Sequence, residues 1–497
     1  MIFDITLSNT TTDISKKSNS LLLKIFSDKK NLKKELDDFL STKNIVLNSS
    51  IKKNFLSKDK HEIKFVNNAG KPDNVILSKI FADEKFDVDK FREMMSKLII
   101  GLKDGNIDFS QVDLPNYSCF EKFYSSPEYF YQTFVEGIHL GNYTFDQYKS
   151  DRKAPKKLNI NFNSSDKSLK AAIKKGNELL KAVNFAKDLS NEPAITLTPA
   201  ELYKRTKKEL SKVGVSVTAL NKSEMKKRKM NSLLAVAEGS DNPPYLIILK
   251  YKPAKRSSKK IALVGKGVTY DSGGYSIKPT DSMIEMNGDM AGASAVIGTI
   301  MAAAKLKLNV ELIGVIPAVE NMVSGRSYKP GDIISTASGK TIEVKNTDAE
   351  GRLILADALE YASKLKPDEI LDFATLTGAV VVALGEFTAG LFTKNDKIAH
   401  DLKGSGEKTF ERIWQLPFWD DFSEGLKSEI ADTSNLGPRW GGAITAGKFL
   451  EKFVDEKIPW AHIDLAGPAL KHKFRSYTEK YNTGFGVRLM IDYLSKK

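Results

Sequence analysis

Cysteine is almost absent from this sequence of 497 residues, and so are the signals of membrane insertion or export. Its single cysteine, Cys119, cannot form an internal disulfide bond, and a zinc site made of several cysteines is excluded. No stretch approaches the roughly 18–20 uninterrupted apolar residues that a membrane-spanning helix needs. The first residues lack the basic region, apolar block and cleavage site of a secretory signal. These absences predict a cytoplasmic protein that does not enter a membrane.

Positive charge is unevenly distributed along the chain. The net charge is +14, and residues 151–260 alone hold 26 Lys and Arg against 10 Asp and Glu, an excess of +16. Such a segment either binds DNA or another polyanion, or is a solvated surface. We favour the solvated surface, because no aromatic residues interleave with the lysines and no nucleic-acid-binding motif is present.

The length and composition predict two folded domains. Hydrophobic residues make up 41% and charged residues 28%, which is ordinary for a globular protein. Residues 1–165 alternate between strand-like and helical runs, which predicts a smaller N-terminal α/β domain. Residues 166–190 place apolar side chains at helical spacing, and two prolines follow, so we expect a connecting helix. Residues 191–497 then form the C-terminal domain.

Individual elements are also predicted from local patterns. In the N-terminal domain the strand-like runs are residues 44–51, 62–66 and 73–81, and a helical run covers 86–102. In the C-terminal domain the strand-like runs are 245–251, 261–267, 310–319, 369–376 and 460–467, and the helical runs are 288–307 and 351–366. Strand and helix alternate there, which predicts a mostly parallel or mixed sheet with helices on both faces.

Polar residues follow several of these predicted strands. In open α/β sheets, ligands bind beyond the carboxyl ends of the strands. Lys266 ends one strand and Asp271 follows it, while Asp348 and Glu350 lie between a strand-like run and a helix. Asp289 opens a further helix. Four carboxylates from three segments would therefore meet at one edge of the sheet.

Four neighbouring carboxylates need cations to stay ionised in a small cleft. Oxygen ligands with one amine suit Zn, Mn, Mg or Co, and no cysteine or histidine is required. A carboxylate that bridges two ions about 3.5–4 Å apart would make a two-metal site that polarises a carbonyl and activates water, which is the chemistry of amide hydrolysis. Lys278 and Arg352 are nearby cations that could stabilise an oxyanion or hold an anionic base.

Each element has a simpler explanation when taken alone. An aspartate in a loop such as TYDSGG is usually a turn residue, and DAEGR is typical of a helix N-terminus with an acidic first turn. The segment GKGVTYDSGG is not a phosphate-binding loop, because it lacks the Walker spacing and no GxGxxG motif follows a strand. The combination of all these elements favours the metal site.

The segment NTDAEGRLILADAL (346–359) resembles the signature of the M17 leucyl (cytosol) aminopeptidase family. Further blocks resemble the family in the same order: VGKGVTYDSGGYSIKP (264–279), GDMAGASAV (288–296), ATLTGA (374–379), LKSEIADTSN (426–435) and WAHIDLAG (460–467). The resemblance covers roughly residues 180–490. It implies an exopeptidase that removes N-terminal residues, with a preference for Leu and other large apolar ones.

The resemblance also implies roles for single residues. A tighter metal site would use Lys266, Asp271, Asp289 and Glu350, and a more exchangeable site would use Asp271, Asp348 and Glu350. Lys278 matches the lysine that supports the substrate carbonyl, and Arg352 matches the arginine that holds a bicarbonate ion acting as the base. The positions near the substrate would be Asn346, Met286, Thr375, Leu376 and Gly378.

The family resemblance further implies two divalent metal ions per subunit, with Zn or Mn preferred and Co or Mg also suitable, and a homohexamer acting on peptides. The intact set of polar residues argues against a catalytically inactive assembly subunit. The chain departs from the family pattern at Ala291, where the first of two glycines is usual.

Overall fold

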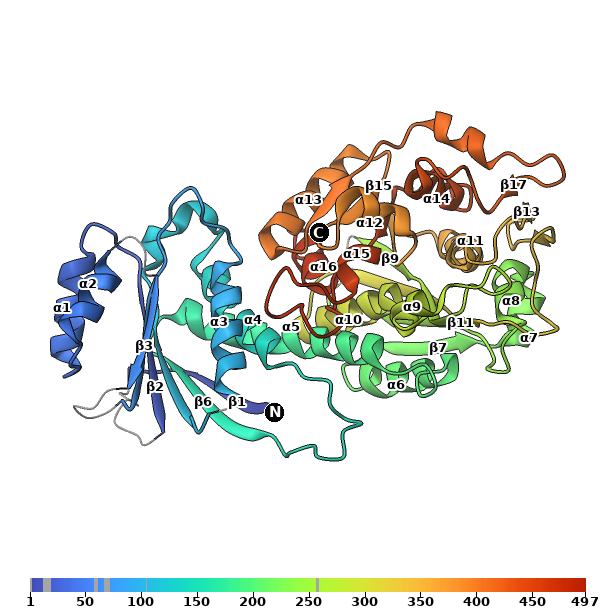
Figure 1. Cartoon of the computed structure of the whole chain (residues 1–497). Helices are drawn as coiled ribbons and strands as arrows, with labels where there is room; N and C mark the ends of the chain where they lie inside the picture. Colours follow the sequence, from blue (N-terminus) through green and yellow to red (C-terminus); the bar gives the residue numbers. More distant parts are fainter. Residues whose placement is uncertain (1, 12–18, 58–60, 67–71, 104, 256–258) are drawn as a thin grey trace. The chain divides into compact units, whose positions relative to one another are not determined.

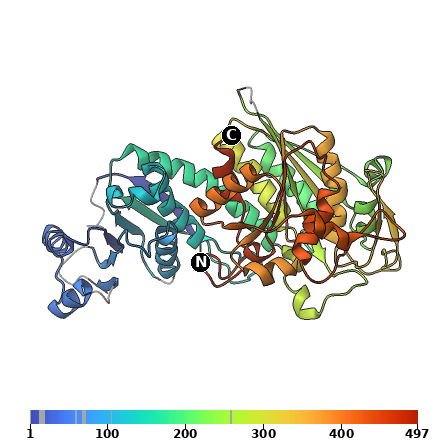
Figure 2. The same cartoon turned by 90° about the horizontal axis from the view of Figure 1, so that it is seen from above.

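The computed structural model describes residues 2–11, 19–57, 61–66, 72–103, 105–255 and 259–497. The chain divides into two compact units, Met1–Leu180 and Lys181–Lys497. The division falls inside helix α5 (Lys167–Asn191), which occupies the region of the predicted connecting helix. Both units combine a β-sheet with helices (Figures 1 and 2).

The N-terminal unit contains a six-stranded sheet in the order β1-β6-β5-β2-β4-β3. All neighbours pair in parallel except β3 and β4. The strands are β1 (Phe3–Asn9), β2 (Ser20–Phe26), β3 (Glu62–Val66), β4 (Asn74–Lys79), β5 (Phe109–Asp113) and β6 (Lys156–Phe162), and the helices before α5 are α1 (Leu32–Thr42), α2 (Ser49–Leu56), α3 (Lys90–Leu102) and α4 (Pro127–Asn142).

Both faces of this sheet are covered, as the side chains of β2 demonstrate. Leu21 and Leu23 belong to the core that includes α3 and α4, whereas Leu22 belongs to the core that includes α1 and α2. This follows from the two-residue period of a strand. The predicted small α/β domain is therefore built with helices on both sides of its sheet (Figure 1).

The strand predicted at residues 44–51 is wrong. Residues 45–48 are irregular and α2 begins at Ser49. The side chain of Asn48 accepts a hydrogen bond from the backbone N–H of Ser50 at 2.8 Å, so it caps the helix and ends the extended run. Ile45 is buried against the core of α1 and α2, which accounts for part of the apolar pattern without a strand.

The C-terminal unit contains a nine-stranded mixed sheet in the order β16-β15-β18-β14-β9-β11-β8-β7, with β10 also paired to β11. Its centre, β18-β14-β9-β11, is parallel, whereas β15 and β8 pair antiparallel with their inner neighbours. The strands are β7 (Ser216–Leu220), β8 (Tyr245–Tyr251), β9 (Lys260–Gly265), β10 (Gly267–Asp271), β11 (Glu311–Asn321), β14 (Glu369–Ala374), β15 (Ala389–Phe392), β16 (Ile413–Gln415) and β18 (Trp460–Asp464). The prediction of a mostly parallel or mixed sheet is confirmed.

The described part of the C-terminal unit contains eleven α-helices besides the end of α5. They are α6 (Pro199–Ser211), α7 (Lys222–Lys227), α8 (Asn231–Ala237), α9 (Thr280–Met283), α10 (Ala291–Leu306), α11 (Glu350–Lys364), α12 (Gly378–Leu384), α13 (Asp396–Thr409), α14 (Gly442–Glu451), α15 (Ala466–Ala469) and α16 (Val487–Leu494). Several of them, including α10 and α11, pack on this sheet. A three-stranded sheet is formed by β12 (Ile333–Ser335), β13 (Thr341–Glu343) and β17 (Thr433–Ser434).

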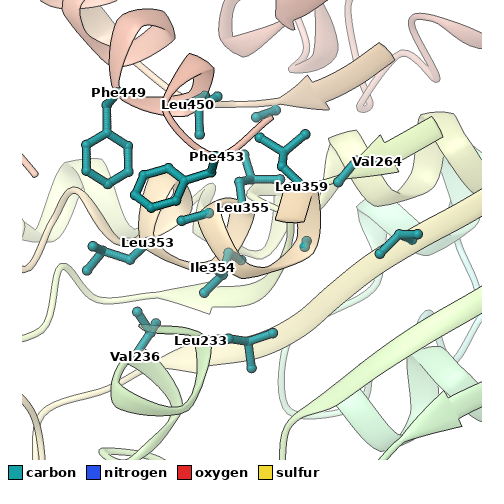
Figure 3. Close-up of a cluster of buried hydrophobic side chains, with 14 of the residues drawn as sticks. Leu233, Val236, Val264, Leu353, Ile354, Leu355, Leu359, Phe449, Leu450 and Phe453 are labelled. Carbon is teal, nitrogen blue, oxygen red and sulfur yellow. The ribbon is translucent and has the colours of Figure 1, made fainter. Parts of the chain in front are cut away.

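The main core of this unit lies around α11. Leu353 and Leu355 of α11 belong to one buried cluster with Leu233 of α8, Phe449 of α14 and Val264 of β9 (Figure 3). Full burial of one such leucine is worth about 1.5–3 kcal/mol. This core therefore holds α11 firmly, and the first residue of α11 is Glu350.

The segment Thr280–Leu306 is long and apolar enough to cross a membrane by length and composition. However, 89% of its most apolar part is buried inside the protein. Helix α10 contacts β9, β14 and α16, as expected for a core helix.

Candidate active site

The carboxyl ends of the central strands border a cavity of about 430 Å³. Lys266 follows β9, Asp271 ends β10, and Thr375 follows β14. Ten of the twelve residues proposed from the sequence line this cavity: Lys266, Asp271, Lys278, Met286, Asp289, Asp348, Glu350, Thr375, Leu376 and Gly378. The parallel register brings together segments that are distant in the sequence.

Lys266 is buried at the base of the cavity and forms a network with three oxygen atoms. Its Nζ lies 2.7 Å from Asp289 and 2.8 Å from Glu350, and it donates a hydrogen bond to the carbonyl oxygen of Thr375 at 2.8 Å. Burial alone would lower the pKa of Lys266, but the negative charges of Asp289 and Glu350 outweigh it and raise this pKa.

Asp271 is held by hydrogen bonds at the end of β10. Its Oδ1 accepts hydrogen bonds from the backbone N–H of Gly273 and from the side-chain amide of Asn321, both at 2.8 Å. Gly273 and Gly274 have φ values of 85° and 63°, a region that favours glycine, so the TYDSGG loop can turn sharply at this point. The carboxylate is therefore oriented before any ligand binds.

Lys278 is the second cation of the cavity. Its Nζ lies 2.9 Å from Asp271 and 2.5 Å from Asp348. Burial acts to lower the pKa of Lys278, but the surrounding carboxylates, led by Asp271, raise it. Lys278 is therefore placed beside the carboxylates rather than facing open solvent.

Asp271, Asp348 and Glu350 converge closely enough to hold a metal ion. One carboxylate oxygen from each lies within 4.8 Å of the others. Burial raises the pKa of both Asp348 and Glu350, and the charge of Asp271 raises it further. A bound divalent cation would offset this repulsion.

Asp289 lines the same cavity and offers a further carboxylate beside this cluster. Its Oδ1 accepts the hydroxyl of Thr375 at 2.7 Å, but its buried Oδ2 has no hydrogen-bond partner among the described residues. Burial raises the pKa of Asp289 well above its usual value. A buried, unpartnered carboxylate oxygen beside other carboxylates fits a metal-binding group.

Arg352 and Asn346 do not line the cavity. The Nη1 of Arg352 donates to the backbone carbonyl of Asn435 at 2.8 Å, and its buried Nε has no partner in the described part of the chain. Burial lowers the pKa of Arg352 to about 10, although Glu350 and Asp464 act in the opposite direction. Asn346 supports the site indirectly, because its side-chain oxygen accepts the backbone N–H of Asp348 at 2.7 Å.

Sequence reasoning missed two asparagines that position the site. Asn321 is the last residue of β11 and orients Asp271, while Asn435 donates to the carbonyl of Asn346 at 2.7 Å. A polar residue at the end of a long apolar strand was an available signal for Asn321. The cavity lining that was also missed comprises Ile277, Pro279, Ser282, Glu285, Gly288, Thr377, Val381, Ala466 and Leu470.

The departure at Ala291 lies next to a position that requires glycine. A Cβ at Gly292 would lie 2.0 Å from the carbonyl oxygen of Phe373, so only glycine fits there. Ala291 is buried at the first position of α10, where alanine is a good helix former. The chain therefore keeps glycine at the position where the helix meets β14.

Comparison with known proteins agrees with this geometry. Residues 184–491 match the model of the cytosol aminopeptidase family, catalytic domain. A probable cytosol aminopeptidase of Persephonella marina is 46% identical to this chain, and the match covers 86% of each protein. A probable cytosol aminopeptidase of a Sulfurihydrogenibium species is 41% identical, and that match covers 97% of this chain and 96% of the relative.

Solved structures are also similar. A mutant of tomato leucine aminopeptidase has a TM-score of 0.85 at 31% identity, covering 100% of this chain and 97% of its own. The bottromycin maturation enzyme BotP, in complex with Mn, has a TM-score of 0.83 at 28% identity over 97% of this chain and 99% of its own. The chain therefore belongs to the cytosol aminopeptidase (M17) family of peptide hydrolases.

Proposed function

We propose that this aminopeptidase removes N-terminal Leu and other large apolar residues from peptides, using water activated by two divalent metal ions. The observation that carries the proposal is the convergence of Asp271, Asp348 and Glu350 within 4.8 Å beside a cavity of about 430 Å³. Few structural roles would require so many buried carboxylates at one sheet edge.

The donor set fits metal ions. One site would use Lys266, Asp271, Asp289 and Glu350, and a more exchangeable site would use Asp271, Asp348 and Glu350. Lys266 can bind a metal only as a neutral amine, so the metal would displace the proton that its ammonium group carries in the present ion pairs. The buried Oδ2 of Asp289, which no described residue hydrogen-bonds, supports this assignment. The predominance of oxygen donors also supports it, since such donors suit Zn, Mn, Co or Mg. When bound, the ions would polarise the scissile carbonyl and lower the pKa of a water molecule. The related BotP was solved in complex with Mn, which favours Mn here, and the family resemblance adds Zn as an equal candidate.

The remaining polar residues have separate roles in the proposal. Lys278 would hold the carbonyl oxygen of the scissile bond, since its ammonium group borders the cavity next to the carboxylates. Arg352 would hold a bicarbonate ion as the base, and its Nε, which has no partner among the described residues, leaves a donor for that anion. Asn346 would keep the backbone of Asp348 in place.

The lining of the cavity supports the preference for apolar first residues. Met286, Thr375, Leu376 and Gly378 would lie near the substrate. The apolar side chains at the cavity are Ile277, Met286, Leu376, Val381, Ala466 and Leu470. Such a lining favours a large apolar side chain by burial of its surface.

Two further features are proposed from the family. The relatives are named cytosol aminopeptidases, so we place the chain in the cytoplasm. We also expect a homohexamer, as the family resemblance implies.

The test is hydrolysis of Leu-p-nitroanilide by the purified protein before and after strong chelation. We expect activity to disappear with the metal, as determined by elemental analysis, and to return with Mn, Zn or Co. Full turnover by metal-free protein would overturn the two-metal part of the proposal.

The requirement for a free N-terminus is tested separately. Acetyl-Leu-p-nitroanilide should resist cleavage, because acetylation removes the free α-amino group that would coordinate one of the two metal ions. Rates near those of the unblocked substrate would mean an endopeptidase or an acylase instead.

A further inference from the structure

Asp464 is a fully buried carboxylate outside the proposed metal cluster, and it touches both loops that form one wall of the cavity. It is the last residue of β18. Its Oδ1 accepts the backbone N–H groups of Leu376 at 3.0 Å and Ala466 at 3.3 Å, and its Oδ2 accepts the hydroxyl of Thr377 at 2.7 Å. Leu376, Thr377 and Ala466 all line the cavity.

The contact with Thr377 extends the influence of Asp464 to helix α12. Thr377 is the N-cap of α12, and its hydroxyl oxygen also accepts the backbone N–H of Val380 at 3.1 Å. The hydroxyl group therefore accepts from the helix while it donates to Asp464, which fixes its orientation. Gly378 and Val381 of α12 complete this wall of the cavity.

The loop between β14 and α12 is held at its other end by the charged cluster. The hydroxyl of Thr375 donates to Asp289, and its carbonyl oxygen accepts from Lys266. Residues 375–377 are thus fixed to the reaction centre on one side and to Asp464 on the other. The separation between the charged centre and the apolar wall depends on both attachments.

We propose that Asp464 is a positioning residue that sets the preference for the first residue of the substrate. By fixing the wall built from Leu376, Val381 and Ala466, it gives the cavity a defined width for a large apolar side chain. A hydrophobic pocket distinguishes side chains that differ by one methylene by roughly 10–200-fold, provided that its walls are held in place. This inference rests on the proposed aminopeptidase function of the same cavity.

The test compares Leu-p-nitroanilide with Ala-p-nitroanilide as substrates of the metal-loaded enzyme. Asp464→Asn preserves size and one acceptor oxygen, but the amide nitrogen cannot accept the hydroxyl of Thr377. We expect the ratio of kcat/KM for Leu over Ala to fall about tenfold, which is at the low end of what such a pocket contributes. The loss should appear mainly as a higher KM for the Leu substrate, because the contact concerns binding of its side chain.

A matched control separates this role from general destabilisation. Asp357 is also a fully buried aspartate that accepts two backbone N–H groups, from Leu233 at 2.9 Å and Ala337 at 2.8 Å, but it does not line the cavity. Asp357→Asn should leave the Leu-to-Ala ratio unchanged.

A second pair of variants covers the case in which Asp464→Asn does not fold. Thr377→Val removes only the hydroxyl and should lower the ratio in the same direction, whereas Thr377→Ser keeps the hydroxyl and should recover the ratio. An unchanged ratio in active Asp464→Asn or Thr377→Val protein would overturn the inference, as would an equal loss for both substrates. If the wild-type protein cleaved neither substrate, the proposed function itself would fail.

Discussion

Gly351 is a position where one added methyl group should reduce activity far more than stability. It is the second residue of α11, and an added Cβ would lie 2.7 Å from Cε and 2.8 Å from Nζ of Lys266. Carbon atoms in contact prefer about 3.5–4.0 Å, so the end of the Lys266 side chain would have to move by roughly 1 Å. It cannot do so freely, because its ammonium group is held by Asp289, Glu350 and Thr375.

The expected size of the effect follows from this displacement. A misplacement of about 1 Å in an active site costs roughly 100-fold in rate. That factor corresponds to about 2.7 kcal/mol of transition-state stabilisation. Alanine improves helix propensity over glycine by about 1 kcal/mol, whereas overpacking costs about 1–3 kcal/mol. The free energy of unfolding should therefore change by no more than about 2 kcal/mol.

The assay measures kcat/KM for Leu-p-nitroanilide, the metal content by elemental analysis and the Tm of Gly351→Ala protein. The matched control is Gly404→Ala in α13, where an added Cβ meets nothing within 4 Å. The control should retain wild-type kcat/KM. Wild-type activity in Gly351→Ala protein would refute the argument that the position of Lys266 is tightly held and needed.

Three further predictions follow from the charged groups. Asp271→Ala or Glu350→Ala should abolish turnover and metal occupancy without unfolding the protein, and two metals per chain in either variant would contradict the ligand assignment. Burial raises the pKa of Asp357 to about 7, above the roughly 3.9 of an unfolded chain, so the folded state binds an extra proton between these values. As the pH rises from about 4 to 7, the free energy of unfolding of the wild type should therefore fall by up to about 4 kcal/mol relative to that of the Asp357→Asn variant. If the Tm values of the two proteins changed in parallel over this pH range, this prediction would be wrong. The protein should bind duplex DNA only feebly, even at low salt. A second function would be established if the wild type bound DNA tightly near physiological salt and a variant with residues 226–229 changed to serine lost this binding but kept its peptidase activity.

Local sequence patterns were sufficient for the long elements of the C-terminal unit. The apolar runs of β8, β9, β11 and β14 and the helices α10 and α11 were predicted because hydrophobic periodicity is a property of neighbouring residues. The failure at residues 44–51 has the same origin, since Ile45 and Val46 suit a strand until the cap by Asn48 starts α2. A local hydrophobic pattern does not show whether an apolar run continues as a strand or ends at a helix cap.

The sequence by itself determined the family, the mixed α/β fold and most of the polar residues that line one cavity, although Arg352 and Asn346 of the predicted set lie outside its lining. Its motifs are short and contiguous, so they can be read without the fold. Only the tertiary structure decided which residues support them: Asn321 reaches Asp271 across 50 positions, and Asp464 reaches Leu376 across 88. Such pairs depend on strand register and on the packing of α11 and α12 against the sheet, and these non-local contacts leave no periodic signal in the sequence.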